Sequence, residues 1–338
     1  MLDENPDAVR SADGSRFLLA VFGKHPAWSD HLEDIGIDTP SLAAFKRWLY
    51  VDGIRTNLDT GAWERLPDDR KVADWNHRLF MTGPKGMLIA RLWATSDGRG
   101  RRAYPMVAVT HLPTTRLPAD LGPLFDVLDD VRSRCMAAET QDEVRAAARH
   151  GRGALESAVK LLSPLPPEGP SQQDRSRFIH EHERESFERV LHVMANDLGP
   201  FSPSNKNKRS GPIRPRAFRL PVPLTDPETD LLIWHAFFQP HLRPETLWTA
   251  VHPLDAPWAD VIVGDLDVES VFFFRASQGE VPVLSDIPYS IPPERLATFS
   301  TILENFMTPP FVIPSLDGDI SQPGKLSSVM GRLFGRGS

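Results

Sequence analysis

Histidines and carboxylates are crowded between His180 and His192 of this 338-residue sequence, and such a cluster could bind a metal ion. His and carboxylate side chains are common zinc ligands. His180 and His182 are two residues apart, so on a regular helix they point about 200° from each other and cannot hold one ion together. The group also lacks the HExxH spacing of zinc peptidases. We therefore expect a solvated helical face with near-neighbour ion pairs. A metal-dependent hydrolase that uses the His180–His192 cluster is the alternative hypothesis.

A basic loop at 98–102 offers a different chemistry, because two glycines there alternate with Arg99, Arg101 and Arg102. The loop has neither the GxxxxGK[ST] pattern nor the strand–GxGxxG–helix context of nucleotide-binding loops. It is either a solvated hairpin tip or a group of arginines that grips an acidic or phosphorylated partner through bidentate contacts. The sequence also has no GxSxG elbow. We assign no catalytic residue, metal ligand or cofactor, and we expect a protein that is not an enzyme.

The segment 23–30, GKHPAWSD, joins turn-forming residues to chemically active ones directly after an apolar run. A turn shaped by glycine and proline can project a lysine, an indole and a carboxylate together towards a partner. In the structural alternative, Trp28 covers the edge of the core, while Asp30 caps a turn or pairs with Lys24. We predict that this turn lies beside the arginine loop on one accessible surface. The residues assigned to this partner-binding surface are Gly23, Lys24, Pro26, Trp28, Asp30, Arg99, Arg101, Arg102, Tyr104 and Pro105.

Hydrophobic periodicity indicates the elements that must position these turns. Apolar residues run from Phe17 to Phe22, as in a buried strand. Turn signals separate three further strand-like segments, at 78–82, 86–94 and 103–112, which predict an antiparallel meander. Helical spacing recurs at 42–49, 121–150, 154–162, 173–198, 225–238, 268–275 and 292–307, and short strands are expected at 217–220, 247–251 and 261–263. The predicted fold is mixed α/β, with a largely antiparallel central sheet flanked by helices and a second α/β portion.

The distribution of proline, glycine and charge predicts how the chain is divided. The stretch 199–216 is polar, basic and rich in Pro, Gly and Ser, which is typical of a flexible linker. The segment Thr225–Glu228 matches a capping box at the start of the next helix. The predicted order is a disordered arm (1–15), an N-terminal α/β domain with a helical extension (16–198), a flexible basic linker (199–216), a C-terminal α/β portion (217–308), and a Pro-rich tether with a short basic helix (309–338).

Composition excludes several classes of protein. A net charge of −7 and a pI near 5.9 argue against nucleic-acid binding by bulk electrostatic attraction. The single cysteine, Cys135, has no intramolecular disulfide partner, and its apolar helical context predicts a buried, reduced thiol. No run of 18 apolar residues is present and the N-terminus is acidic and polar, so we expect a soluble, cytoplasmic protein.

The order of several short motifs resembles the TagF/ImpM family, which is associated with post-translational control of bacterial type VI secretion. The opening "G-K-x-P-x-x-x-D" turn of that family is matched by Gly23, Lys24, Pro26 and Asp30. Later landmarks follow in family order, namely a helix with Trp48, a strand that starts at Trp75, the Arg-x-aromatic-Pro motif of Arg102, Tyr104 and Pro105, the strand at Leu247–Trp248, and the closing helix at 267–274.

The resemblance covers 17–150, and more loosely 225–276. Ser29 and Arg101 stand where the family usually has glycine. The resemblance implies a mixed α/β fold and a regulator that restrains secretion by contacting a forkhead-associated scaffold component. Some relatives are fused to a Ser/Thr phosphatase, of which this sequence shows no trace. A structural adaptor inside a secretion assembly is a further alternative.

The C-terminal segment 325–336 has the spacing of an amphipathic helix with basic residues. Its apolar stripe consists of Leu326, Val329, Met330, Leu333 and Phe334. So short a helix with two glycines is marginal in water, so it either packs on its own domain or stays frayed. The functional alternative is a docking helix that enters a partner's groove or lies on an anionic membrane surface.

Overall fold

The chain forms two compact units. The computed structural model describes residues 9–10, 16–113, 116–166, 169–181, 183–203, 213–222 and 226–307. The first unit is built from described residues within Met1–Pro164, Thr249–Ala256 and Leu266–Val281, and the second from those within Leu165–Trp248, Pro257–Asp265 and Pro282–Ser338. The division at 164/165 differs from the predicted linker at 199–216. The composition of a stretch indicates its flexibility, but it does not show which segments pack together. Here Thr249–Ala256 and Leu266–Val281 pack with the first unit although they follow the predicted linker.

The strands of the first unit lie in the order β1-β2-β5-β4-β3-β7. Their bounds are β1 (Val9–Arg10), β2 (Arg16–Gly23), β3 (Asn76–Gly83), β4 (Gly86–Trp93), β5 (Met106–Leu112) and β7 (Trp248–Pro253). The pairs β1–β2, β2–β5, β5–β4 and β4–β3 are antiparallel, which confirms the predicted meander. Val9 and Arg10 pair with β2, so the expectation of disorder throughout 1–15 was wrong at these two residues.

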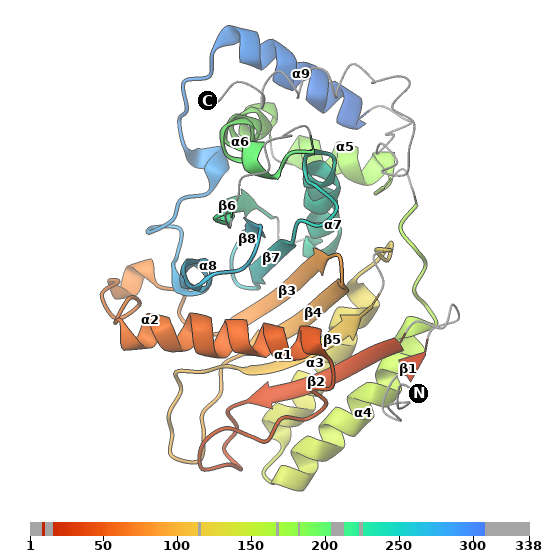
Figure 1. Cartoon of the computed structure of the whole chain (residues 1–338), viewed down its shortest axis with the longest axis vertical. Coiled ribbons are helices and arrows are strands. Elements are labelled where there is room, and N and C mark those ends of the chain that lie inside the picture. The colour runs from red at the N-terminus through yellow and green to blue at the C-terminus, as the bar shows by residue number, and fades with distance from the viewer. Residues whose placement is uncertain are drawn as a thin grey trace. The chain divides into compact units, whose positions relative to one another are not determined.

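Helices cover both faces of these strands. Their bounds are α1 (Pro40–Lys46), the π-helical η1 (Arg47–Arg55), α2 (Thr56–Asp59), η2 (Asp68–Arg70), α3 (Gly122–Ala137), α4 (Gln141–Val159), α8 (Val268–Phe272) and η5 (Phe273–Arg275). Figure 1 shows α1 in front of the strands and α3 and α4 behind them, and α3 packs on β4 while α4 packs on β2. Every residue of β5 is consequently buried, because both of its faces are covered.

A capping box divides the helical stretch predicted at 121–150. The Thr140 side chain accepts a hydrogen bond from the Glu143 N–H at 3.3 Å, and the Glu143 carboxylate accepts one from the Thr140 N–H at 2.9 Å. These two bonds satisfy N–H groups that the start of a helix leaves without intrahelical partners, so α4 begins here as a separate helix.

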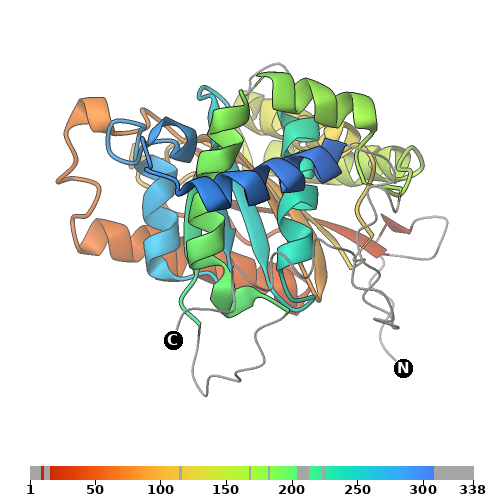
Figure 2. The same cartoon turned by 90° about the horizontal axis from the view of Figure 1, so that it is seen from above.

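Among its described residues, the second unit combines two strands with helices. Its elements are α5 (Gln172–Glu181), α6 (Arg184–Asp197), η3 (Gly199–Phe201), β6 (Arg216–Pro221), α7 (Pro227–Phe238), η4 (Gln239–His241), β8 (Trp258–Val263), η6 (Leu284–Asp286) and α9 (Pro293–Met307). Strands β6 and β8 are antiparallel, and buried Arg219 and Asp260 join them through two hydrogen bonds of 2.8 and 2.9 Å. Figure 2 shows α9 lying across α6. The predicted fold class, mixed α/β with largely antiparallel strands and flanking helices, is confirmed.

Helix α7 begins one residue later than the predicted capping box. Its N-cap is Asp226, whose carboxylate accepts a hydrogen bond from the Thr229 N–H at 3.3 Å, and Pro227 occupies the first turn. Proline is suited to that position because it has no N–H to satisfy. Thr225 lies outside the described residues.

Two predictions fall on parts of the chain that the structure does not describe. These are the tether and docking helix at 309–338, with Leu326, Val329, Met330, Leu333 and Phe334, and residues 204–212 of the predicted linker. Among the described residues, none of the helices combines the length and apolar character needed to cross a membrane.

Candidate functional site

Gly23 fixes the end of β2 against the start of β5. Its φ of +128° is one that glycine adopts without strain. A Cβ at this position would lie 2.5 Å from the Pro105 carbonyl oxygen and 2.6 Å from the Tyr50 hydroxyl oxygen. That hydroxyl donates a hydrogen bond to the same carbonyl. Only glycine therefore allows β2 and the segment before β5 to approach this closely.

The turn that follows β2 is closed by backbone contacts and anchored by His25. Lys24 and His31 form an antiparallel bridge, and the Leu32 N–H donates to the Gly23 carbonyl at 2.8 Å. The His25 Nδ1 accepts from the Ala27 N–H at 3.1 Å, which leaves the ring proton on Nε2 to donate to the Cys135 carbonyl at 2.9 Å. Burial lowers the pKa of His25, and the bond to Cys135 partly opposes this shift. The ring is thus a neutral structural link between the turn and the C-terminal end of α3.

Asp97 is the centre of the site. Its carboxylate lies 2.5 Å from the Lys24 Nζ and 2.7 Å from the Arg101 Nε, and it accepts 3.0 Å hydrogen bonds from the backbone N–H groups of Arg99 and Arg101. Burial opposes ionisation of Asp97, but the bonds from Lys24 and from the backbone outweigh it and hold its pKa below the usual range. The carboxylate therefore stays charged and fully engaged.

The turn 24–31 and the arginine loop are joined as one structure. The Arg101 guanidinium donates to the Asp30 carboxylate at 2.8 Å and to the Ser29 carbonyl at 3.3 Å. The Gly98 N–H donates to the Trp28 carbonyl at 2.6 Å. The predicted neighbourhood of these two turns is therefore what the structure shows.

Exposure within this group differs from the sequence interpretation. Lys24 is buried, and its ammonium group pairs with Asp97 and, at 3.4 Å, with Asp30. Its side chain therefore does not project to solvent. Gly23 and Pro105 are also buried, and Trp28 is half-buried with its ring against His25. Tyr104 is half-buried and packs against the rings of His31 and Tyr50. The exposed residues of the turn and the loop are Pro26, Ser29, Asp30, His31, Gly98, Arg99, Gly100, Arg101 and Arg102.

The three arginines of the loop are used differently. Arg101 is held by Asp97 and Asp30. Arg102 pairs with Asp74 at 3.1 Å on the surface. The Arg99 side chain is exposed and has no hydrogen-bond or ion-pair partner among the residues that the structure describes. Arg99 is therefore the guanidinium most available to a ligand at this site.

A pocket of about 270 Å³ opens beside these turns. It is lined by His25, Pro26, Trp93, Ala94, Thr95, Ser96, Arg102, Cys135, Met136 and Ala138. Met136, near the end of α3, is 57% exposed. Arg102 thus lines this pocket together with apolar and small polar residues.

Sequence reasoning missed Asp97, Tyr50 and His25. Asp97 stands in SDGRGRR, where the sequence analysis considered the glycines and arginines but not the carboxylate. An Asp before glycine in such a turn commonly accepts backbone N–H bonds two residues on, and Asp97 does this with Arg99. This preference could have identified Asp97 from the sequence, but not its bond to Lys24.

The histidine cluster does not lie on one helix. The predicted helix at 173–198 is divided into α5 and α6 at Glu183, which has a φ of +58°. His182 lies outside the described residues, His180 is exposed, and His192 packs against the ring of Tyr289. Across the described ranges, no group of three or more His, Cys, Asp or Glu side chains is placed to hold a metal ion.

Comparisons with known proteins give little that bears on this site. No protein-family model matches the chain, and no curated protein does. Among solved structures, PA0076 from Pseudomonas aeruginosa PAO1 is 18% identical with a TM-score of 0.28, over 39% of this chain and 60% of that chain. The chain thus spans less than two thirds of that protein's length. A likeness of this size supports no assignment of fold or function.

Proposed function

We propose that this chain is a non-catalytic regulatory protein of a bacterial type VI secretion system, which acts in the cytoplasm by contact with a protein partner. The resemblance to the TagF/ImpM family suggests that the contact restrains secretion and that the partner is a forkhead-associated scaffold component. The partner-binding surface is formed by the turn 24–31 and the loop 97–102.

The observation that carries this proposal is the convergence of the motif residues on Asp97. Lys24 belongs to the opening motif and binds Asp97 directly, and Arg101 links Asp97 to Asp30 of the same motif. Gly23 lies against Pro105 of the later Arg-x-aromatic-Pro motif. Residues that are far apart in the sequence thus build one local structure. Such cross-linking fixes the backbone of both turns, and a fixed backbone reduces the entropy that a partner must overcome on binding.

The bonding inside the site favours recognition over catalysis. A general base needs access to substrate and a pKa near the working pH. Asp97 is buried with a pKa below its usual range, and both ring nitrogens of His25 are engaged. The groups left exposed are arginines and Asp30, which suit charge-assisted contacts with a protein surface.

The direct test is binding of the full chain to the forkhead-associated protein of the same secretion system. The variant Arg99→Ala/Arg102→Ala removes two exposed guanidinium groups and leaves the Asp97 network in place. We expect binding at least about tenfold weaker, measured by biolayer interferometry. The matched control is Arg47→Ala/Arg55→Ala, which removes two arginines on η1 whose side chains are 76% and 66% exposed. Equal affinity for both variants, or no binding by the parent chain, would contradict the proposal.

Metal analysis separates this function from the hydrolase alternative. A regulator that acts by contact needs no bound metal, whereas a hydrolase using the His180–His192 cluster does. Stoichiometric zinc or manganese in the purified protein, together with loss of metal in His192→Ala, would favour the hydrolase.

A further inference from the structure

A pocket of about 320 Å³ lies on the first unit, between the segment 33–36 and helix α4. The segment is held beside β2 by two backbone hydrogen bonds between Ile35 and Val21, of 3.0 and 2.9 Å. From α4 the pocket is lined by Arg145, Ala148, Arg149 and Arg152. Spacings of three and four residues place these side chains on one face of the helix.

Small residues make the space and place one arginine in it. Gly36 has a φ of +73°, and a Cβ there would lie 2.4 Å from the Leu19 carbonyl oxygen and 2.9 Å from the Arg152 Nη2. The Arg152 guanidinium therefore lies against the bare backbone of Gly36, where any side chain would displace it. Ile35 and Ala148 are half-buried and buried, and they add an apolar floor.

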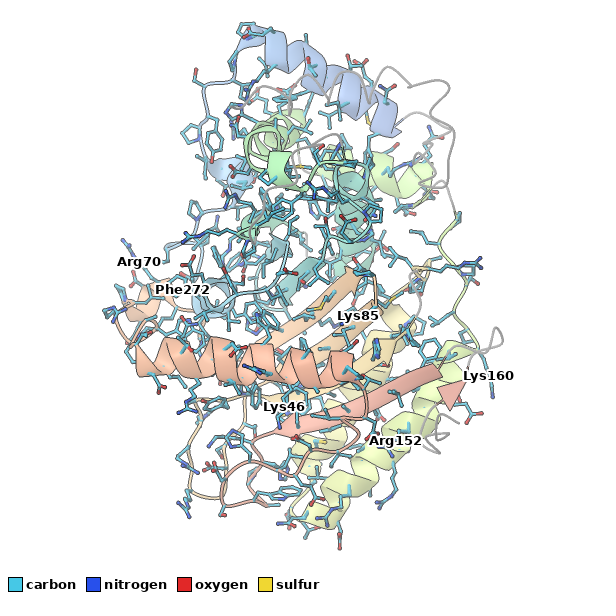
Figure 3. The ribbon with its side chains drawn as sticks, viewed as in Figure 1. Lys46, Arg70, Lys85, Arg152, Lys160 and Phe272 are labelled. Carbon is cyan, nitrogen blue, oxygen red and sulfur yellow. The ribbon has the colours of Figure 1, made fainter. Side chains whose placement is uncertain are left out.

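The two acidic residues of the pocket are already neutralised. Glu33 lies 2.5 Å from the Arg145 Nε, and the bond from Arg145 lowers the pKa of Glu33. Asp34 pairs with Lys46 of α1. Figure 3 shows Lys46 and Arg152 on their separate helices.

Arg145 and Arg149 differ in their bonding. Arg145 also donates to Asp142 at 2.8 Å, so its charge is shared between two carboxylates. Arg149 is exposed and has no hydrogen-bond or ion-pair partner among the residues described. A guanidinium offers five N–H donors, so Arg149 and Arg152 together can surround a tetrahedral oxyanion.

We propose that this pocket binds the phosphate group of a small phosphomonoester. Arg149 and Arg152 donate to the phosphate oxygens, and the organic part of the ligand lies on Ile35 and Ala148. The volume supports an organic part as well as the anion. At about 320 Å³ it lies at the lower end of the range for small-molecule pockets, about 300–1,000 Å³. This site is separate from the proposed partner-binding surface and does not depend on the secretion assignment.

Isothermal titration of the full chain at low ionic strength tests the proposal, with phenyl phosphate and inorganic phosphate as probes. We expect saturable binding of phenyl phosphate, tighter than that of inorganic phosphate because the ring covers the apolar floor. Arg149→Met should weaken binding about tenfold or more, since it removes a charge-assisted donor pair. Arg149→Lys keeps the charge but loses the planar fork, so its affinity should lie between those of Arg149→Met and the parent.

The control is Arg47→Met, which removes an exposed arginine outside the pocket and should bind like the parent. Equal binding by Arg149→Met and the parent, or an equal loss in Arg47→Met, overturns the proposal, because the effect would then come from general surface charge. Arginine-dependent binding with the same affinity for both probes supports the anion site but overturns the role of the apolar floor. Absence of saturable binding by either probe overturns the whole proposal.

Discussion

Lys24 and Asp97 form a buried ion pair across 73 residues of sequence, with the Lys24 Nζ 2.5 Å from the Asp97 Oδ2. The two side chains are 4% and 0% exposed. Lys24 stands directly after β2, while Asp97 stands in the connection from β4 to β5. Gly23, the last residue of β2, pairs with Met106, the first residue of β5. The turn after β2 and the loop before β5 therefore lie at the same end of these strands.

Replacement of Lys24 should expose how much the two turns depend on this pair. Lys24→Met leaves the buried Asp97 carboxylate with Arg101 as its remaining cationic partner. We expect a melting temperature about 5–10 °C lower, because a buried charge that loses its partner is costly. The control Lys85→Met changes an exposed lysine in the β3–β4 turn, which Figure 3 labels, and should melt with the parent. Circular dichroism melts suffice, and coincident curves for all three proteins would show that the pair adds no stability.

The stability of the second unit should depend on pH through Asp230. This carboxyl is fully buried on α7, 3.1 Å from the Arg177 guanidinium. Burial raises its pKa to about 7, although Arg177 opposes the shift. A folded pKa above the unfolded value of 3.8 means that the folded chain binds more protons between these two values. Asp230 therefore lowers the free energy of unfolding as pH rises from about 4 to about 7. Outside this range its contribution does not change with pH.

Asp230→Asn provides the measurement, since the amide keeps the shape and cannot ionise. Relative to the parent, this variant should gain stability steadily from pH 4 to pH 7 in chemical denaturation. The parent protein, measured in denaturant at the same pH values, is the reference. If Asp230→Asn instead lost stability with rising pH, the bond to Arg177 would outweigh burial and the pKa would lie below the ordinary value.

Cys135 should be inert in the folded protein. The thiol is fully buried, and burial raises its pKa to about 12. The thiolate is the reactive form, so Ellman's reagent at pH 8 should report almost no thiol before denaturation and one thiol per chain in guanidinium. The chain has a single cysteine, which makes the count unambiguous. Rapid labelling of the native protein would mean that α3 opens readily near the partner-binding surface.

Substitution to alanine should change the free energy of unfolding in opposite directions at two glycines of α4. A Cβ at Gly151 would lie 2.3 Å from the Val131 Cγ2 and 2.8 Å from the Leu19 Cδ2, whereas a Cβ at Gly153 would have nothing within 4 Å. Gly151→Ala should therefore lower the free energy of unfolding by about 1–3 kcal/mol through overpacking. Gly153→Ala should raise it by about 0.5–1 kcal/mol through helix propensity. Denaturant titration gives both values, and a gain in stability for Gly151→Ala would show that α4 does not pack closely against Val131 and Leu19.

Local features of the sequence determined most of the element types. The continuous apolar run at 17–22 and the strand-like segments separated by GPKG and SDGRGRR predicted the meander, because alternation and turn residues act over a few neighbours. The helix boundaries were less well predicted. Thr140 divides a helical stretch through a bond to Glu143 that competes with continuation of the helix, and Asp226 caps α7 where Thr225 was expected.

The sequence by itself also selected the two turns that the fold brings together, since each combines glycine with charged residues beside a buried strand. Only the tertiary structure decided what those residues do. Lys24 looked like a projecting cation, yet strand pairing puts it against Asp97 and buries it, so Arg99 is left as the available charge. The pocket of Arg149 and Arg152 was likewise out of reach, because the segment 33–36 joins it through hydrogen bonds to β2. Burial and long-range partners depend on which elements pack together, and nothing in the spacing of neighbouring residues encodes that directly.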